Sequence, residues 1–320
     1  MAAIEVTGLT KDYGTVLAND DLTFEVAEGE VFGYLGPNGA GKTTTIRTLM
    51  GFQSPTGGSA TVLGNDVTDE SALIAAKRRV GFLPSNPAFD EQVTGREILD
   101  LHASIKGDER REELLSVFDP PLDRKIRAYS TGNVQKLGLV QAFMHDPDLV
   151  VMDEPTSGLD PLMQRKFNEF VDAEKADGLT VFLSSHVLSE VRRVCDRVGV
   201  LRQGRLVTTE RIEDLLDRTG KFIRVRVAGD VGSDAFALDG VHDVVCSTTE
   251  GGEADDSDGT GDEAPDDATT DGPVTECTFT FTGDVNDLVT RLGEHRLVDL
   301  DVEEAPLEEV FMRFYGETDV

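Results

Sequence analysis

The residues with the clearest chemical use lie between Gly36 and Thr44, where Gly36 and Gly41 enclose four residues and Lys42 and Thr43 follow directly. Glycines at this spacing let the backbone turn tightly, so that successive N–H groups point inward at a phosphate. Lys42 then reaches the β- and γ-phosphates of a nucleotide, and the Thr43 hydroxyl ligates Mg²⁺. The pattern predicts a nucleoside triphosphate site formed by Gly36, Pro37, Asn38, Gly39, Ala40, Gly41, Lys42, Thr43 and Thr44.

The segments on either side of this loop are consistent with a phosphate site. Residues 31–35 form an apolar run that predicts a buried strand, and residues 44–50 predict a helix that stops at Gly51. The helix N-terminus adds a partial positive charge at the loop. The alternative is a plain glycine-rich turn with an exposed lysine, and the strand and helix favour the phosphate loop over it.

A second motif places two carboxylates at the end of an apolar run. Residues 149–152 are Leu, Val, Val and Met, and Asp153 and Glu154 follow. In sheets of this kind the strand end lies beside the phosphate loop, so Asp153 can hold Mg²⁺ and Glu154 can orient or deprotonate an attacking water. The alternative is two solvated acids in an acidic protein, which the buried strand leading directly to them disfavours.

The charge balance limits the class of partner. The 320 residues carry a net charge of −31, and the stretch 250–271 holds ten acidic and no basic residues, which leaves −21 on the rest of the chain. A generic nucleic-acid binder needs a basic face, so no nucleic-acid partner is expected. Arginine outnumbers lysine, and we hypothesise adaptation to a salty cytoplasm, where screening makes a heavily charged surface tolerable.

Cysteine spacing predicts the redox state of the thiols, and hydropathy predicts whether the chain crosses a membrane. Cys195, Cys246 and Cys277 are odd in number and widely spaced, which predicts reduced thiols. No apolar run reaches the ~20 residues of a membrane span, and residues 1–10 are not a signal peptide. If the protein works at a membrane, another chain must supply the spans.

The length of the chain predicts two domains, and a change of pattern after Arg218 places them at residues 1–218 and 219–320. The first alternates strands and helices, as in an α/β layered domain. Thr94 and Glu97 form a capping box for a helix over 95–106, and Asp160 and Pro161 begin another. The separation of 111 positions between Lys42 and Asp153 predicts a helical insertion. The predicted strands are 31–35, 80–83, 149–152, 180–183 and 198–201.

The second domain is predicted to be a small α+β unit. Residues 222–227 and 277–281 alternate like half-buried strands, and helices are expected over 287–292 and 306–315. The acidic stretch, about 249–272, has too little apolar surface to order itself and is expected to be a disordered loop.

These motifs together resemble the ATP-binding cassette (ABC) ATPases. Residues 153–161, Asp-Glu-Pro-Thr-Ser-Gly-Leu-Asp-Pro, look like the joined Walker B motif and D-loop, and residues 129–133, Tyr-Ser-Thr-Gly-Asn, stand where the signature motif stands. His186 resembles the switch histidine, and Tyr13, ahead of the first predicted strand, resembles the aromatic that stacks on adenine. The resemblance implies a P-loop NTPase fold, an ABC-type nucleotide-binding domain with a helical insertion, followed by the α+β accessory domain.

The resemblance also implies ATP and Mg²⁺ as cofactors and a head-to-tail dimer with a second ABC ATPase subunit, either a homodimer or a heterodimer. Ser130 and Gly132, at the start of a helix expected over 134–145, would then contact ATP held by the other subunit. Asp160 either caps its helix or acts in the D-loop across the dimer, and both can hold. His186 is expected at the γ-phosphate rather than as a structural histidine, and Tyr13 at adenine rather than in the core.

Three positions depart from the family pattern. The family usually has glycine where Thr131 stands and often glutamine where Asn133 stands. The Q-loop glutamine, which touches the metal site and relays to the membrane partner, would be expected at Ser85. Ser85 or Asn86 could act through a water, so the resemblance predicts hydrolysis more firmly than coupling.

The order and spacing of the motifs most resemble stand-alone ATPase subunits of exporter-type transporters, and residues 305–311 resemble the ending of those with an accessory domain. The expected function is ATP hydrolysis that powers a separate membrane permease, docked near residues 83–90 and the following helix, with the chain cytoplasmic and peripheral on the inner face of the membrane. One alternative is a soluble ABC ATPase acting on nucleic acid or ribosomes. Another is a nucleotide-binding regulator without turnover.

Overall fold

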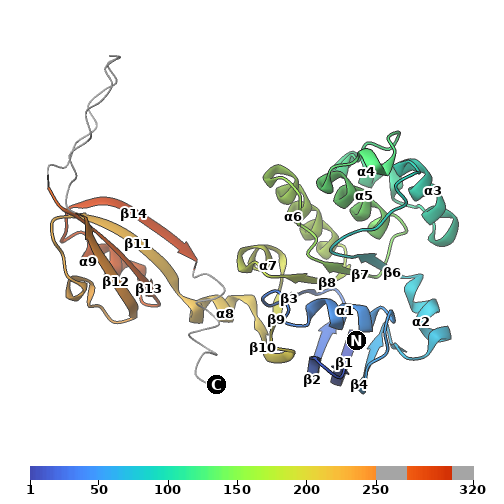
Figure 1. The fold of residues 1–320 in the computed structure, drawn as a ribbon, viewed down its shortest axis with the longest axis horizontal. Coiled ribbons are helices and arrows are strands. Elements are labelled where there is room, and N and C mark those ends of the chain that lie inside the picture. The colour runs from blue at the N-terminus through green and yellow to red at the C-terminus, as the bar shows by residue number, and fades with distance from the viewer. Residues whose placement is uncertain (250–271, 305–320) are drawn as a thin grey trace, which may run out of the picture. The chain divides into compact units, whose positions relative to one another are not determined.

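The computed structural model describes residues 1–249 and 272–304, which belong to two compact units, Met1–Ile212 and Glu213–Val320 (Figure 1). The expected division after residue 218 falls inside helix α8 (Ile212–Thr219), and the units divide at the start of that helix.

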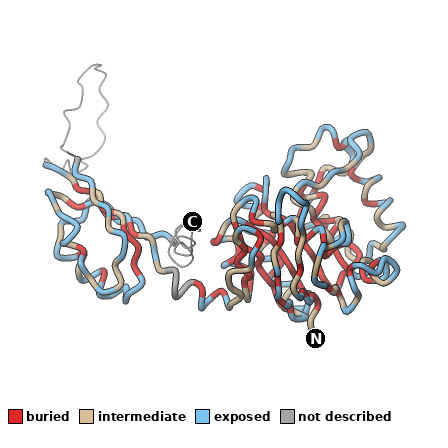
Figure 2. Tube along the Cα trace, turned by 60° about the horizontal axis from the view of Figure 1, so that its bottom comes forward, coloured by how far each residue is buried: buried red, intermediate tan, exposed pale blue. Residues whose placement is uncertain are grey.

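The first unit is built on a six-stranded sheet. β3, β6, β7, β8 and β9 run parallel, and β10 pairs antiparallel at one edge. The strands, in sheet order, are β10 (Arg205–Arg211), β9 (Arg197–Arg202), β3 (Val31–Leu35), β8 (Thr180–Ser185), β7 (Leu149–Asp153) and β6 (Val80–Leu83). β3, β7 and β8 are buried at every residue, as expected of strands covered on both faces (Figure 2). The five strands predicted from apolar runs are confirmed, with ends shifted by at most two residues.

Helices lie between the strands of this sheet along the chain, where the sequence predicted them. The helical insertion between Lys42 and Asp153 is confirmed, and it contains α3, α4, α5 and the 3-10 turn η1. The Thr94–Glu97 capping box starts α3, and Asp160 with Pro161 starts α6. The helices are α1 (Lys42–Leu49), α2 (Glu70–Lys77), α3 (Gly95–Lys106), α4 (Arg111–Phe118), η1 (Ile126–Ala128), α5 (Thr131–Phe143), α6 (Pro161–Ala176) and α7 (Leu188–Val194).

A second sheet in this unit was not predicted from the sequence. It is antiparallel and consists of β2 (Leu17–Ala27), β1 (Ala2–Asp12), β4 (Gly57–Val62) and β5 (Asn65–Asp66), in that order. Phe24 of β2 stacks on Phe32 of β3 and on Phe182 of β8, with ring centroids 5.8 and 6.2 Å apart. This aromatic contact joins the two sheets. Tyr13 therefore follows a strand, β1, instead of preceding the first one.

The second unit is a four-stranded antiparallel sheet in the order β12–β13–β11–β14. Its elements are β11 (Lys221–Ala228), the 3-10 turn η2 (Ser233–Phe236), β12 (Val241–Thr249), β13 (Val274–Phe281), α9 (Val285–Leu292) and β14 (Leu297–Glu304). This is the β-α-β-β-α-β order of ferredoxin-like sheets, with one turn in place of the first helix. Its apolar core includes Val225, Phe236, Phe279 and Leu288.

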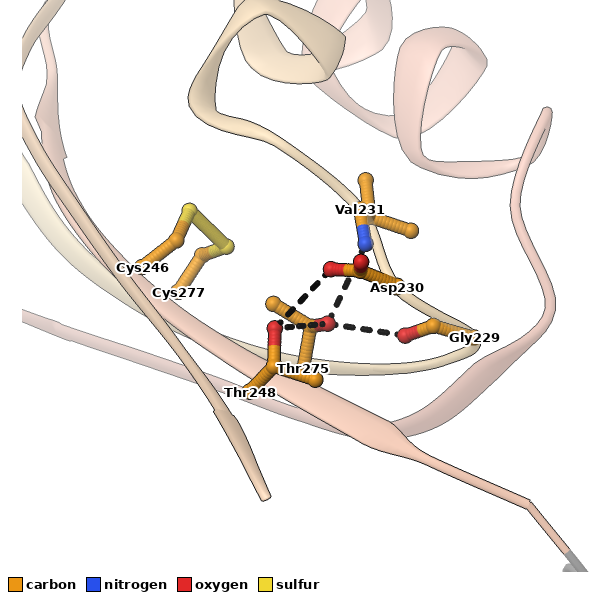
Figure 3. Close-up of a disulfide and its surroundings, with 7 residues drawn as sticks. All are labelled: Gly229, Asp230, Val231, Cys246, Thr248, Thr275 and Cys277. Atoms are coloured by element: carbon orange, nitrogen blue, oxygen red, sulfur yellow. Dashed lines mark hydrogen bonds between the residues drawn. A yellow bond between two sulfur atoms is a disulfide. The ribbon is translucent and has the colours of Figure 1, made fainter. Parts of the chain in front are cut away.

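The prediction of three reduced cysteines is wrong for two of them. Cys246 and Cys277 form a disulfide (Figure 3). The free Cys195 is buried. The strand register explains the pairing, because Cys246 of β12 lies directly opposite Cys277 of β13, with 4.1 Å between their Cα atoms. The two are 31 residues apart in sequence, so spacing alone did not reveal the pair.

Two sequence predictions lie outside the described residues: the loop at about 249–272, apart from its ends, and the helix over 306–315. Among the helices of residues 1–249 and 272–304, none has the length and apolar character needed to cross a bilayer.

Candidate active site

The glycine-rich loop joins β3 to α1 at the end of the parallel sheet. Gly39 and Gly41 have φ values of +81° and +109°, a conformation that side chains rarely adopt. At Gly41 a Cβ atom would also lie 2.3 Å from the Ala18 carbonyl oxygen, so only glycine fits. Within residues 1–249 and 272–304, no side chain caps the N-terminus of α1, so its first backbone N–H groups can bind an anion.

Buried polar contacts hold the start of α1 in place. The Asn19 amide donates to the Gly41 carbonyl at 3.3 Å and to the Thr45 hydroxyl at 3.0 Å. The Tyr34 hydroxyl of β3 lies 3.1 Å from the same Thr45 oxygen. Burial raises the pKa of Tyr34, so its phenol stays protonated.

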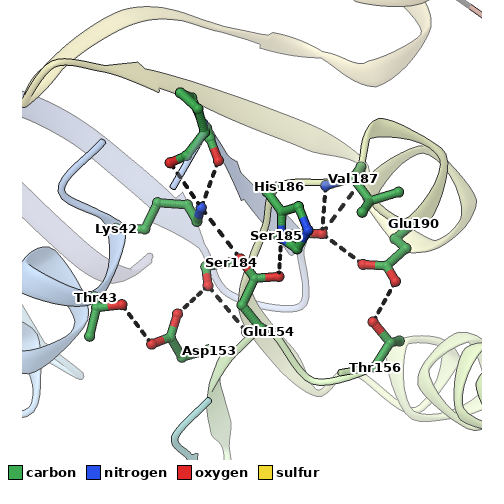
Figure 4. Close-up of polar contacts among 12 residues, drawn as sticks. Lys42, Thr43, Asp153, Glu154, Thr156, Ser184, Ser185, His186, Val187 and Glu190 are labelled. Atoms are coloured by element: carbon green, nitrogen blue, oxygen red, sulfur yellow. Dashed lines mark hydrogen bonds and ion pairs between the residues drawn. The ribbon is translucent and has the colours of Figure 1, made fainter. Parts of the chain in front are cut away.

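Lys42 is buried and points along the loop toward the end of β7 (Figure 4). Its Nζ donates to the Gly36 carbonyl at 2.6 Å and to the Pro37 carbonyl at 3.3 Å. The same Nζ lies 3.3 Å from Oε1 of Glu154. The loop backbone therefore holds the ammonium group next to the predicted catalytic carboxylate.

Asp153 ends β7 among hydroxyl groups. Thr43 of α1 donates to its Oδ2 at 2.9 Å, and Ser184 of β8 donates to its Oδ1 at 2.5 Å. A carboxylate and a hydroxyl side by side are the oxygen ligands that Mg²⁺ prefers, so the donor set fits the predicted metal.

Glu154 follows with a φ of +52°, which is uncommon for a side-chain-bearing residue and is typical of functional sites. Its N–H donates to the Ser184 carbonyl of β8 at 3.1 Å. One carboxylate oxygen faces Lys42, and the other lies 2.8 Å from Nδ1 of His186, directly after β8. Three neighbouring strand ends thus bring Lys42, Glu154 and His186 together.

Two residues at this site were missed by the sequence analysis. The Gln135 amide of α5 donates to the Pro155 carbonyl at 2.8 Å and supports the turn after Glu154. Glu190 of α7 accepts from the Thr156 hydroxyl at 2.6 Å and from the Ser185 hydroxyl at 2.7 Å. Glu190 therefore joins the loop that follows Glu154 to the loop that carries His186. Each is one polar residue on a helix, and no sequence pattern distinguishes it.

Tyr13 is exposed in the turn between β1 and β2 and is tied to α1. Its hydroxyl donates to the Gln53 amide oxygen at 2.6 Å, and the Gln53 nitrogen donates to the Thr44 carbonyl at 2.9 Å. Lys11 Nζ lies 5.2 Å from the ring centroid. The ring therefore has a solvent-facing surface close to α1, the helix that follows the glycine loop.

Ser130 caps α5, because its hydroxyl accepts from the Asn133 N–H at 3.3 Å. The helix starts at Thr131 rather than at the predicted residue 134, which places Thr131 in helical conformation with no positive φ. A Cβ at Gly132 would lie 2.7 Å from the Gly158 carbonyl, so this glycine allows α5 to approach the loop after Glu154. Within the described residues, no contact joins Ser130 or Gly132 to Lys42 or Glu154.

Asp160 caps α6 and accepts from the Met163 N–H at 2.9 Å. This is the helix-capping role that the sequence predicted. Ser85 and Asn86 follow β6, and in the described part of the chain no side-chain hydrogen bond connects either to Glu154 or Asp153.

Comparison with known proteins identifies the family. Residues 19–157 match the family described as ABC transporter. Bacitracin transport ATP-binding protein BcrA of Bacillus licheniformis is 35% identical over 231 residues, which cover 70% of this chain and 75% of BcrA. The chain belongs to the ATP-binding proteins of ABC transporters.

Two further relatives are also named as ATP-binding proteins. An uncharacterised ABC transporter ATP-binding protein of Nostoc sp. is 42% identical, and the match covers 60% of this ABC ATPase but only 59% of the relative. Nod factor export ATP-binding protein I of Mesorhizobium japonicum is 37% identical over 67% of this chain and 65% of its own length.

Solved structures confirm the predicted ABC ATPase fold. The ATP-binding subunit of an ABC transporter, 32% identical, aligns with a TM-score of 0.62 over 68% of this chain and 92% of that one. A dimeric ATP-binding cassette in a post-hydrolysis state, bound to ADP and Pi, is 23% identical and has a TM-score of 0.61 over 65% of this chain and 98% of that one.

Proposed function

We propose that this ABC ATPase hydrolyses ATP to power a separate membrane permease, and that the transport is export. The observation that carries the proposal is the Glu154 carboxylate between Lys42 and His186, beside a glycine loop built for phosphates. The names of two relatives, bacitracin transport and Nod factor export, support the direction.

ATP binding uses groups that are already oriented. The N–H groups of the loop and Lys42 bind the β- and γ-phosphates, while the exposed face of Tyr13 stacks on adenine. Thr43 and Asp153 would hold Mg²⁺, which when bound neutralises charge on the phosphate oxygens.

In hydrolysis, Glu154 orients a water and accepts its proton as the water oxygen bonds to the γ-phosphorus. The bond from that phosphorus to the β,γ-bridging oxygen breaks, and the electron pair leaves with ADP. His186 contacts a γ-phosphate oxygen and holds Glu154 in position. Glu190 is a positioning residue, because it holds the loops on either side of these two groups together.

The proposed active form is a head-to-tail dimer. Ser130 and Gly132 lie at the N-terminus of α5, and within the described residues they make no hydrogen bond with this chain's own Lys42. They can meet the γ-phosphate bound by a second subunit. The dimeric relative described above supports the association. Loss of the γ-phosphate would remove the bridge and open the dimer, and the permease would follow this two-state cycle.

The proposed docking surface for the permease includes α3. The sequence places Ile98, Leu101 and Ile105 on one face, yet Leu101 and Ile105 are 62% and 64% exposed, and the helix is anchored instead by the fully buried Leu99. Exposed apolar side chains on one helix face suit a cytoplasmic helix of a permease. Binding there would hold the chain at the cytoplasmic face of the membrane.

A pull-down tests this proposal. Tagged E154Q protein is recovered from its native membranes in high salt with ATP, and the co-purifying chains are identified by mass spectrometry. We expect a stoichiometric polytopic membrane chain. Adding Leu101→Asp and Ile105→Asp to the E154Q protein should abolish its recovery, while the same two changes in the chain with Glu154 intact should leave phosphate release unchanged. Recovery of soluble partners alone would contradict the permease and favour the soluble cassette ATPase.

A further inference from the structure

Gln53, four residues after α1, connects the ring of Tyr13 to that helix. The Tyr13 hydroxyl donates to Oε1 of Gln53 at 2.6 Å. Nε2 of Gln53 donates to the Thr44 carbonyl at 2.9 Å and to the Thr48 hydroxyl at 3.0 Å. Thr44 and Thr48 both belong to α1, the helix that follows the glycine loop. One amide group therefore links an exposed aromatic side chain to the phosphate-loop helix.

The groups around Gln53 determine which end of its amide faces Tyr13. The Thr44 carbonyl can accept a hydrogen bond but cannot donate one, so Nε2 of Gln53 must point toward it. The Thr48 hydroxyl donates its own hydrogen to the Thr44 carbonyl at 2.9 Å, so its oxygen accepts the second N–H of Gln53. Oε1 is left to accept from the Tyr13 hydroxyl. Both N–H groups and the oxygen of the amide are thus used.

The turn that carries Tyr13 has backbone supports of its own. The Asp12 N–H donates to the Thr56 hydroxyl at 3.0 Å, and the Tyr13 N–H donates to the Val16 carbonyl at 3.0 Å. Neither contact uses the side chain of Gln53. The bond from Tyr13 to Gln53 therefore acts on the orientation of the ring and not on the backbone beneath it.

One face of the Tyr13 ring is covered by a cation. Nζ of Lys11 lies over the ring, 5.2 Å from its centroid, and donates to the Ser54 carbonyl at 2.7 Å. Tyr13 is nevertheless 52% exposed, which leaves the opposite face for a base. An exposed aromatic side chain can change rotamer, and the hydrogen bond to Gln53 removes that freedom before a ligand arrives.

We propose that Gln53 is a positioning residue for the nucleotide base, because it holds the Tyr13 ring in the orientation that stacks on adenine. In the proposed function, on which this role rests, Tyr13 binds the base and residues 36–44 bind the phosphates. Since α1 follows the phosphate loop and also anchors Gln53, the stacking surface is fixed relative to the phosphate site. ATP then meets a ring that is already in place, and less affinity is lost in ordering it.

Nucleotide binding to the full-length chain tests this role, because inorganic tripolyphosphate resembles the phosphates of ATP but has no base. Both are titrated by calorimetry without Mg²⁺, so that ATP is not turned over. In Q53M, which keeps the length of the side chain and removes its amide, ATP affinity should fall roughly 3- to 10-fold. Tripolyphosphate affinity should stay within about twofold, since no ring has to be ordered for it. The matched control Q92M changes an exposed glutamine and should alter neither.

The Tyr13 hydroxyl provides an independent measurement of the same bond. Y13F removes the hydrogen bond but keeps the ring, so its loss of ATP affinity should match that of Q53M. The double variant Q53M/Y13F should bind ATP no more weakly than either single variant, because each change removes the same interaction. Y13A removes the stacking surface and should lower ATP affinity further than these variants.

Equal losses for ATP and tripolyphosphate in Q53M would show that Gln53 supports α1 alone and would overturn the proposal. Additive losses in Q53M/Y13F would also overturn it, because the two residues would then act separately. Unchanged ATP affinity in Q53M, together with weakened binding in Y13A, would overturn the role of Gln53 and leave the stacking on Tyr13 intact. Unchanged ATP affinity in Y13A would overturn the stacking itself, which is part of the proposed function.

Discussion

The two units place their charged residues in different ways. In the parallel sheet, β3, β7 and β8 are buried throughout, and polar groups gather where the strands end, at Asp153, Glu154, Ser184 and His186. In the sheet of the second unit, buried and exposed residues alternate, and charges such as Arg224, Arg226 and Glu276 are spread along the strands.

This difference distinguishes the first unit, which can form a site, from the second unit, which serves as a scaffold. Buried parallel strands leave their ends as the place where polar groups converge, so several loops can act on one ligand. An alternating antiparallel sheet solvates its charges one by one and gathers none of them around a common point. We therefore expect changes at the strand ends of the first unit to alter catalysis, and changes in the second unit to alter stability alone.

The largest effect on ATP binding is expected for Lys42→Ala. The change removes charge-assisted contacts to the phosphates, each worth about 1.5–3 kcal/mol, so ATP affinity should fall by roughly 10- to 100-fold. Isothermal titration with ATP measures this. Lys166→Ala, on the exposed surface of α6, is the matched control and should bind normally. Unchanged ATP affinity in Lys42→Ala would contradict the assignment of residues 36–44 as a phosphate loop.

A smaller catalytic effect is expected for Glu190→Ala. Without its two hydrogen bonds the loops carrying Glu154 and His186 lose their common support, so kcat should fall roughly tenfold while KM stays within about twofold. Glu190→Gln keeps one acceptor oxygen and should recover part of the loss. The control is Glu169→Ala, whose carboxylate pairs only with the exposed Arg165 in the described residues. An increase in KM with normal kcat would show that Glu190 serves binding instead of positioning.

Removing the disulfide of the second unit should change stability without changing the site. Cys246→Ser with Cys277→Ser should lower the free energy of unfolding of this unit by about 2–4 kcal/mol. Denaturant titration measures it, with reductant-treated wild type as the control. A change in ATP affinity in this variant would contradict the expectation that changes in the second unit alter stability alone.

Salt should affect both units, because the net charge of −31 extends over the described chain as well as the acidic stretch. The screening length falls from about 10 Å at 0.1 M salt to about 3 Å at 1 M, so self-repulsion weakens and the melting temperature should rise by several degrees. Thermal unfolding across this range provides the measurement. Full stability at low ionic strength would exclude adaptation to high salt.

The sequence predicted best what depends on local pattern. Apolar runs predicted β3 and β7, and the Thr94–Glu97 capping box predicted α3, because burial and capping depend on residues that are close in sequence. β1, β2 and β14 mix polar residues into their strands, and their pairing partners are distant, so the sequence did not identify them.

The candidate site divides in the same way. The glycine loop and the Asp153–Glu154 pair were predicted because their spacing is specific. Glu190 and Gln135 act through tertiary contacts across 34 and 20 residues, which no local pattern reveals. The Cys246–Cys277 bond likewise depends on strand register.

Glu154 is expected to activate water at a site where ATP binds without its help. Phosphate release and ATP binding measured together for Glu154→Gln test this role, with Glu169→Gln as the control. We expect ATP affinity within a few-fold of wild type, phosphate release lowered by roughly 10²- to 10³-fold, and a dimer that persists in ATP. Undiminished phosphate release in Glu154→Gln would contradict it.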